Sequence, residues 1–233
     1  MNVLPQHIAV IPDGNRRWAR ARRLSPWEGH REGVKRFREV SEVAWQSGVP
    51  YFTFWAGSEE NLLERSRIEV RFLVSLLKNE LRRQLASRET EEKQIRFRLI
   101  GRWREILKDK KLNDLAEKLE EKTKNFVKCH LTILFGYDGR REMAEAIHKI
   151  KDKREKIKAD YDMIKSALWT RELPMVDVVL RTGGEPHWSA GFMMWHTAYS
   201  QFYFTEKFWP DFDEKEFKKA LTDYARRERR FGK

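Results

Sequence analysis

The chain has 233 residues, of which 40% are hydrophobic and 12% are aromatic. This composition excludes a disordered chain, and the length fits one domain over residues 1–233. No apolar run approaches the roughly 18 residues of a membrane-spanning helix, and the first residues lack the pattern of a signal peptide. The net charge of +12 predicts attraction to anions: nucleic acid, anionic lipid and phosphorylated small molecules all qualify.

Cysteine and histidine usage narrows the classes further. Cys129 is the single cysteine, which excludes an internal disulfide framework and fits a reducing cytoplasm. Because Val127 and Leu131 flank it, we interpret it as a core thiol rather than a nucleophile. The six histidines show no zinc-type spacing, so we predict no structural zinc.

Strand-like and helix-like patterns alternate along the chain. Strands are predicted at residues 7–11, 51–55, 95–100, 130–136, 176–180 and 201–205. Helices are predicted over residues 34–44, 68–86, 112–119 and 143–150, with an exposed charged extension over 151–160, and from residue 214 onward. The run at 95–100 alternates apolar and basic residues, which favours a strand near a sheet edge. The order predicts a single α/β domain with a mostly parallel central sheet flanked by helices.

Ligands of open α/β sheets bind beyond the carboxyl ends of the strands, so the loops there are the candidate site. The loop after residues 7–11 reads DGNRRW. Gly14 lets the backbone approach a ligand closely, and Arg16 and Arg17 offer charged donors of the kind that a diphosphate accepts. Asp13 would repel phosphate unless Mg²⁺ bridges the two. The alternative is a simple Asp-Gly-Asn turn.

Two further loops carry polar chemistry. Ser58, Glu60 and Asn61 follow the second strand, where they either bind a ligand or cap the next helix. The segment RTGGEPHWS follows the strand at 176–180 and places two glycines beside an arginine, which is typical of an anion nest. No G-x-x-x-x-G-K-[ST] or G-x-G-x-x-G motif is present, so nucleotide binding by those routes is unsupported.

Taken in order, HIAVIPDGNRRWA, EGHREG, WAGSEEN, VLRTGGEPHWS, FYFTEKFWPDFDEKEF and RRERRFG resemble the cis-prenyltransferases, the family of undecaprenyl diphosphate synthase. The resemblance implies a homodimeric α/β enzyme with a hydrophobic tunnel. Such enzymes condense allylic and homoallylic prenyl diphosphates with Mg²⁺ and form a cis double bond. It also implies a cytoplasmic protein that associates peripherally with membranes without spanning them.

The resemblance assigns roles by position. Asp13 would hold Mg²⁺ and help the allylic diphosphate leave, and Asn61 would assist proton removal. Trp18 and Leu62 would line the substrate. The allylic diphosphate would be bound by Gly14, Asn15, Arg16, Arg17, His30, Ser58, Glu60 and Arg65. The acceptor diphosphate would be bound by Arg181, His187, Ser189, Arg230 and Gly232.

Four positions depart from the family pattern. His187 stands where an arginine would clamp the acceptor, and Gln201 replaces the glutamate that completes the Mg²⁺ site, which makes it a weak metal ligand. Leu62 replaces a tryptophan, and Pro26 replaces an arginine. Because histidine does not substitute for a bidentate arginine, our hypothesis is that donor ionisation survives while acceptor handling has changed. Non-head-to-tail (lavandulyl-type) coupling of two allylic diphosphates, one of them dimethylallyl diphosphate, is one such change.

Three other interpretations stay open. The first is ordinary cis elongation with isopentenyl diphosphate despite the changes. The second is a non-catalytic partner subunit of a heteromeric prenyltransferase, against which Asp13 and the terminal Arg-Phe-Gly speak. The third is a basic nucleic-acid-binding protein, but the tryptophans fall in or near the loops rather than between basic residues on one face, so we expect no nucleic acid partner.

Overall fold

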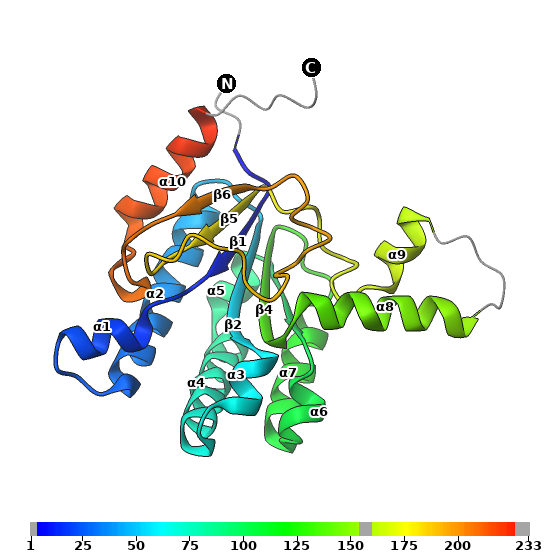
Figure 1. Cartoon of the computed structure of the whole chain (residues 1–233), viewed down its shortest axis with the longest axis horizontal. Coiled ribbons are helices and arrows are strands. Elements are labelled where there is room, and N and C mark those ends of the chain that lie inside the picture. Colours follow the sequence, from blue (N-terminus) through cyan, green and yellow to red (C-terminus); the bar gives the residue numbers. More distant parts are fainter. Residues whose placement is uncertain (1–3, 154–159, 227–233) are drawn as a thin grey trace.

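The computed structural model describes residues 4–153 and 160–226 (Figure 1). Its centre is a six-stranded sheet with the order β3-β4-β2-β1-β5-β6, and every neighbouring pair is parallel. The strands are β1 (His7–Ile11), β2 (Tyr51–Ser58), β3 (Ile95–Ile100), β4 (Cys129–Tyr137), β5 (Val178–Arg181) and β6 (Gln201–Phe204). The predicted α/β class, the parallel sheet and the edge position of the strand at 95–100 are confirmed.

Long helices cover the sheet, and short ones join the elements. They are α1 (Asn15–Ala21), α2 (Pro26–Gln46), α3 (Glu59–Glu64), α4 (Arg67–Ala86), α5 (Arg88–Glu92), α6 (Trp103–Leu107), α7 (Lys110–Thr123), α8 (Gly139–Lys153), α9 (Tyr161–Ala167), the 3₁₀ helix η1 (Trp209–Asp211) and α10 (Glu214–Arg226). Within the described residues none of them is both long and apolar enough to cross a bilayer.

Helix boundaries are where the predictions needed correction. Helix α2 begins at Pro26, well before residue 34, because Ser25 and Glu28 form a capping box and proline suits the first helical position. Of the predicted extension over 151–160, residues 151–153 continue α8. Residues 154–159 lie outside the described part of the chain, and Asp160 instead caps the separate helix α9 by accepting from the Met163 amide.

Alternating side chains of the strands build two cores, one on each face of the sheet. Ile8 and Val10 of β1 join the larger core, whereas Ala9 and Ile11 join the smaller one. The larger core is completed by α2, α4, α7 and α10, and Figure 1 shows α4 and α7 standing side by side beneath the sheet. The smaller core is covered by the segment around residues 168–193. Both faces are therefore buried, as parallel sheets require.

The only cysteine starts β4 at the rim of the larger core. Cys129 is partly buried, packs against that core, and its pKa is raised by burial. A thiol whose pKa is raised is a poor nucleophile at neutral pH. The interpretation of Cys129 as a packing thiol fits this environment.

Candidate active site

The carboxyl ends of β1 and β5 bring an acidic side chain, Asp13, and a basic one, Arg181, together. Ile11 lies opposite Arg181 in the register of these strands, so the loop after β1 passes directly over the end of β5. Arg181 Nη2 lies 3.2 Å from Asp13 Oδ2, and Arg17 Nη2 lies 3.1 Å from Asp13 Oδ1. Asp13 thus stands between two guanidinium groups from different parts of the chain. The residues that the sequence singled out after two separate strands meet in one place.

Gly14 shapes this loop. It precedes α1 in a left-handed conformation with φ 101°, which an L side chain rarely adopts, and its N–H donates to Asp13 Oδ1 at 2.6 Å. A Cβ at this position would lie 2.5 Å from the Phe208 ring. The glycine therefore allows both the turn that aims Asp13 into the site and the close approach of the segment that carries Phe208.

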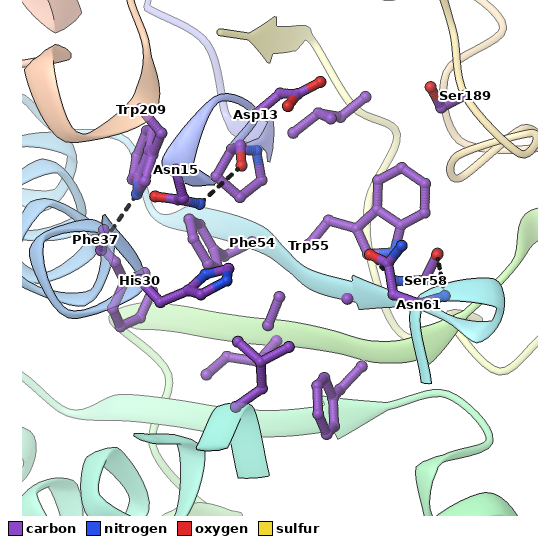
Figure 2. A pocket seen from close by; sticks show the side chains of 18 of the residues that line it. Asp13, Asn15, His30, Phe37, Phe54, Trp55, Ser58, Asn61, Ser189 and Trp209 are labelled. Carbon is purple, nitrogen blue, oxygen red and sulfur yellow. Dashed lines mark hydrogen bonds between the residues drawn. The ribbon is translucent and has the colours of Figure 1, made fainter. Parts of the chain in front are cut away.

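Gly33 leaves room for the side chain of Asn15, the residue that follows Gly14. A Cβ on Gly33 of α2 would lie 2.3 Å from Asn15 Oδ1, so only glycine leaves room for the asparagine side chain. Asn15 Nδ2 donates to the Pro12 carbonyl at 3.4 Å, and a dashed line marks this hydrogen bond of Asn15 in Figure 2. The Gly33 carbonyl accepts from Trp209 Nε1 at 2.8 Å. The start of α1 is thereby held against α2.

Arg181 also connects Asp13 to the loop that follows β5. Its Nη1 donates to the His187 carbonyl at 2.9 Å and to the Ser189 hydroxyl. The His187 ring nitrogen Nε2 lies 3.0 Å from Ser189 Oγ. The Arg181 side chain is only 4% exposed, whereas that of His187 is 55% exposed. The arginine is therefore a buried structural element of the loop, whereas the histidine ring is open to solvent.

A basic hollow opens beside Asp13. It has a volume of about 730 Å³ and is lined, among others, by Arg16, Arg17, Arg20, Arg23, His30, Arg65, Glu69 and Glu185. Arg65 pairs with Glu69 at 2.9 Å, and His30 Nε2 lies 3.4 Å from the same carboxylate oxygen without a hydrogen bond. Burial, aided by Arg65 and opposed by Glu69, lowers the pKa of His30 to about 4, so the ring is neutral at pH 7. The hollow suits a polyanion.

An apolar cavity of about 560 Å³ adjoins this hollow (Figure 2). The two share Pro12, Asp13, Asn15, His30 and Arg65. Away from these residues, α2, α4, β2 and β4 supply the apolar part of the walls: Val34, Phe37, Phe54, Leu73, Leu76, Leu77, Ile133 and Phe135. The polar side chains of the remaining lining are those of Ser58, Glu60, Asn61, Glu80, Arg181, His187 and Ser189. The site therefore has a charged mouth and a partly apolar interior.

Ser58 and Asn61, at the end of β2 and in α3, have both roles that the sequence left open: they cap a helix and they line the site. Ser58 caps α3 by accepting from the Asn61 amide at 3.0 Å, while Asn61 Oδ1 accepts from the Ser58 amide at 3.4 Å. Both residues also line the apolar cavity together with Glu60. Figure 2 shows the Asn61 side chain beside Trp55, across the cavity from His30. The cap fixes the position of Asn61 at the wall.

Three predicted site residues lie away from the cavity lining. Trp18 donates from Nε1 to Asp211 at 2.7 Å, with Arg22 stacked on its ring. Leu62 is buried in the larger core. Gln201 pairs with Val178 at the start of β6, about 10 Å along the strand from the level of Arg181, so the structure does not bring it to Asp13 within this chain. Arg230 and Gly232 fall outside the described residues.

Two acidic residues complete the site without having been predicted. Glu185 lies 3.0 Å from Arg17 and 3.7 Å from Arg181, and Glu69 joins Arg65 and His30. A glutamate that stands near an arginine in the sequence does not by itself indicate a functional site, because such pairs are common on solvated helices. Only Glu185 could have been noticed, since it stands in the Gly-rich loop that was already a candidate.

Asp13 fits the Mg²⁺ that the resemblance implies. Within residues 4–153 and 160–226, no group of three or more histidine, cysteine or acidic side chains could hold a metal by itself. Mg²⁺ commonly takes one or two carboxylates and fills its other positions with substrate phosphate and water. The Asp13 side chain is 34% exposed and faces the arginine-lined hollow, so one of its oxygens can serve in this way once a diphosphate is bound.

Fold and site together define an α/β protein with a basic hollow at the strand ends and an adjoining cavity whose walls are partly apolar. A family model described as "Putative undecaprenyl diphosphate synthase" matches residues 11–232. The chain belongs to this family of cis-prenyltransferases. The resemblance drawn from the motifs is confirmed.

Curated relatives match along the whole chain. An isoprenyl transferase of Fusobacterium nucleatum is 42% identical over 98% of this chain and 96% of its own length. A tritrans,polycis-undecaprenyl-diphosphate synthase (geranylgeranyl-diphosphate specific) of Pyrococcus abyssi is 35% identical over 99% of this chain and 88% of its own.

Two solved structures share the fold over nearly every residue. Lavandulyl diphosphate synthase from Lavandula x intermedia, in complex with dimethylallyl diphosphate, superposes with a TM-score of 0.89 at 31% identity and covers 99% of both chains. A probable undecaprenyl diphosphate synthase from Campylobacter jejuni has a TM-score of 0.79 at 29% identity, with full coverage of both chains.

Proposed function

We propose that the protein condenses an allylic prenyl diphosphate with a C5 diphosphate and releases diphosphate. One observation carries this proposal: the basic hollow and the apolar cavity share Asp13, His30 and Arg65. An amphiphile with a diphosphate head and an isoprenoid tail has the same division between charge and hydrocarbon. A nucleic acid has no tail to place in such a cavity, so this rival is disfavoured.

The donor half of the site would promote departure of the diphosphate. Arg16, Arg17 and Arg65 would hold the phosphate oxygens, and neutral His30 would donate a hydrogen bond from its ring. A Mg²⁺ ion on Asp13 would neutralise the charge that grows on the leaving group. The apolar walls would keep water away from the allylic cation. Part of this hydrocarbon-lined space would be the tunnel that the resemblance implies.

The acceptor half differs from the family pattern, and this difference leaves two candidate reactions. Arg181 and Ser189 would bind the second diphosphate, with His187 in the place of a bidentate arginine. Cis elongation with isopentenyl diphosphate would require removal of a proton from the acceptor, and Asn61 at the cavity wall is the candidate for assisting that removal. Coupling of two allylic diphosphates is the second candidate, and the likeness to lavandulyl diphosphate synthase with dimethylallyl diphosphate favours it.

The assembly and location follow from the same family. We propose a homodimer in the cytoplasm, in peripheral contact with the membrane that would receive a prenyl product. Asp13, paired with Arg17 and Arg181, supports an active subunit rather than a non-catalytic partner of a heteromeric enzyme. Purification of the chain alone as an active homodimer would exclude the non-catalytic role.

The deciding experiment uses paired substrates with Mg²⁺ and mass analysis of the products. Dimethylallyl diphosphate is supplied alone, and separately with isopentenyl diphosphate; C10 to C20 allylic donors follow. A product from dimethylallyl diphosphate alone would establish non-head-to-tail coupling, whereas products that require isopentenyl diphosphate would establish elongation. Absence of any product from all pairs would reject the proposed function.

A further inference from the structure

A charged residue of α4 also lines the apolar cavity. Glu80 of α4 lines the cavity together with Leu73, Leu76 and Leu77 of the same helix, and it is only 3% exposed. A buried carboxylate in the wall of a partly apolar cavity is unusual, because ionised side chains are rarely buried unless they are paired. Its partners therefore decide what the group can do.

Both oxygens of Glu80 are held firmly. Arg38 Nε of α2 donates to Oε2 at 2.7 Å, while Arg83 Nη2 donates to Oε1 at 2.9 Å and Gln84 Nε2 donates to the same oxygen at 3.0 Å. Burial alone would raise the pKa of Glu80, but the hydrogen bonds from Arg83, Gln84 and Arg38 lower it, so the carboxylate stays charged. Gln84 is fixed in turn by Thr90 at 2.8 Å.

These contacts join the two walls of the cavity. Arg38 belongs to α2, which also supplies Val34 and Phe37, whereas Glu80 belongs to α4. Because a hydrocarbon tail offers no hydrogen bonds, it cannot replace the arginines, and pushing Glu80 aside would separate the buried carboxylate from its partners. The ion pair therefore resists displacement by a growing or longer chain.

We propose that Glu80, held by Arg38 and Arg83, is the end wall that limits the length of the isoprenoid tail, and this rests on the proposed function. Glu69 lies at the charged mouth of the site, Glu80 lies three turns further along the same helix, and the rise of an α-helix puts about 16 Å between them. An isoprene unit, four C–C bonds long, spans about 5 Å. The cavity then accepts a tail of about three units, as in a C15 diphosphate.

Binding of non-ionising analogues tests this without turnover. The probes are the thiolodiphosphate analogues of the C10, C15 and C20 allylic diphosphates with Mg²⁺, measured by equilibrium titration. We expect the wild type to bind the C20 analogue about tenfold more weakly than the C15 analogue, since the last unit finds no apolar space. Glu80→Ala should reduce this difference to less than about threefold.

Three variants make the result specific. Glu80→Gln keeps the length of the side chain and an acceptor for Arg38, so it should keep the difference between C15 and C20. Glu39→Ala removes an exposed glutamate of α2 that pairs with Arg36, and it should behave as the wild type. If Glu80→Ala fails to fold because Arg38 is left unpaired, Arg38→Met combined with Glu80→Ala removes both charges and takes its place.

The outcomes separate this inference from the proposed function. A wild type that binds the C20 analogue as tightly as the C15 analogue would overturn the end wall, and so would a difference that survives in Glu80→Ala. Failure of all three analogues to bind would instead reject the prenyl diphosphate site itself.

Discussion

Asp13 and Arg181 come from the ends of neighbouring parallel strands, and their carboxylate and guanidinium groups lie 3.2 Å apart. This pair joins the two halves of the proposed site, because Asp13 faces the basic hollow while Arg181 holds the loop of His187 and Ser189. A change in either residue is expected to affect both substrates.

Replacing Asp13 by alanine tests the role of the carboxylate. We expect Asp13→Ala to lower the rate of diphosphate release at least about a hundredfold, because stabilisation of the leaving group is lost. The variant should fold, since Glu185 still pairs with Arg17 and Arg181. Asp162→Ala, at an exposed position of α9, is the matched control. Unchanged release by Asp13→Ala would contradict the assignment.

The exchange of His187 for arginine tests the acceptor half. An arginine there can donate two parallel hydrogen bonds to a diphosphate, so we expect His187→Arg to lower the KM for isopentenyl diphosphate about tenfold. The ratio of elongated to self-coupled product should rise in the same variant. His148→Arg adds the same charge on the exposed side of α8 and should leave the KM unchanged. A KM that falls equally in both variants would point to net charge alone.

Buried histidines predict a loss of stability in acid. His7 is fully buried, its Nδ1 lies 3.0 Å from the Pro174 carbonyl and its Nε2 2.8 Å from the Thr53 hydroxyl, and burial lowers its pKa from 6.5 to about 4. The unfolded chain therefore binds a proton that the folded chain does not, between pH 6.5 and pH 4. The free energy of unfolding falls as the pH drops through this window, by on the order of 3 kcal/mol for this group.

Urea denaturation at pH 7 and pH 4.5 checks this. His30, His130 and His196 share the lowered pKa and should add to the loss in the wild type. His7→Gln should lose less stability between the two pH values, whereas His148→Gln, which changes an exposed ring, should lose as much as the wild type. An equal loss in His7→Gln would remove His7 from the explanation.

Gly14 is expected to be intolerant of a side chain. Gly14→Ala places a Cβ 2.5 Å from the Phe208 ring at φ 101°, whereas Gly48→Ala has a similar φ of 87° but meets only Leu4 at 3.4 Å. The backbone strain of about 1–2 kcal/mol is common to both, so the excess cost in Gly14→Ala measures the crowding. Urea denaturation of the two variants gives this difference. Equal costs would mean that the segment of Phe208 yields freely.

Most of the architecture could be predicted because its signals are local. The six strands lie where apolar runs and alternation placed them, and the strand at 95–100 shows its basic residues on the wetter side of an edge. Short helices such as α3 (Glu59–Glu64) and α6 (Trp103–Leu107) went unpredicted. Five or six residues are too few to show an apolar stripe, so their existence depends on caps and tertiary contacts.

Site residues could be predicted where they belong to one continuous sequence motif. They could not be predicted where the contact joins residues that are far apart in the sequence. Asp13, Arg17 and Arg181 could be named because they stand at, or within a few residues of, the carboxyl ends of strands. Glu80 could not, since nothing in a Lys-Asn-Glu-Leu sequence on α4 indicates that its carboxylate will meet Arg38 of α2. Contacts of this kind arise from the packing of two helices, which the residues of one helix do not encode.

Because of Gly33, helix α2 contacts the loop of the proposed diphosphate site as well as forming a wall of the apolar cavity. One side of the helix receives Asn15 of the diphosphate loop, and the neighbouring residues Val34 and Phe37 form the wall against which a tail would lie. Enlarging the cavity by shifting α2 would therefore disturb the head-group loop as well. An engineer who wants bulkier substrates should trim side chains on α4 beyond its first turn, where room can be made without touching the chemistry.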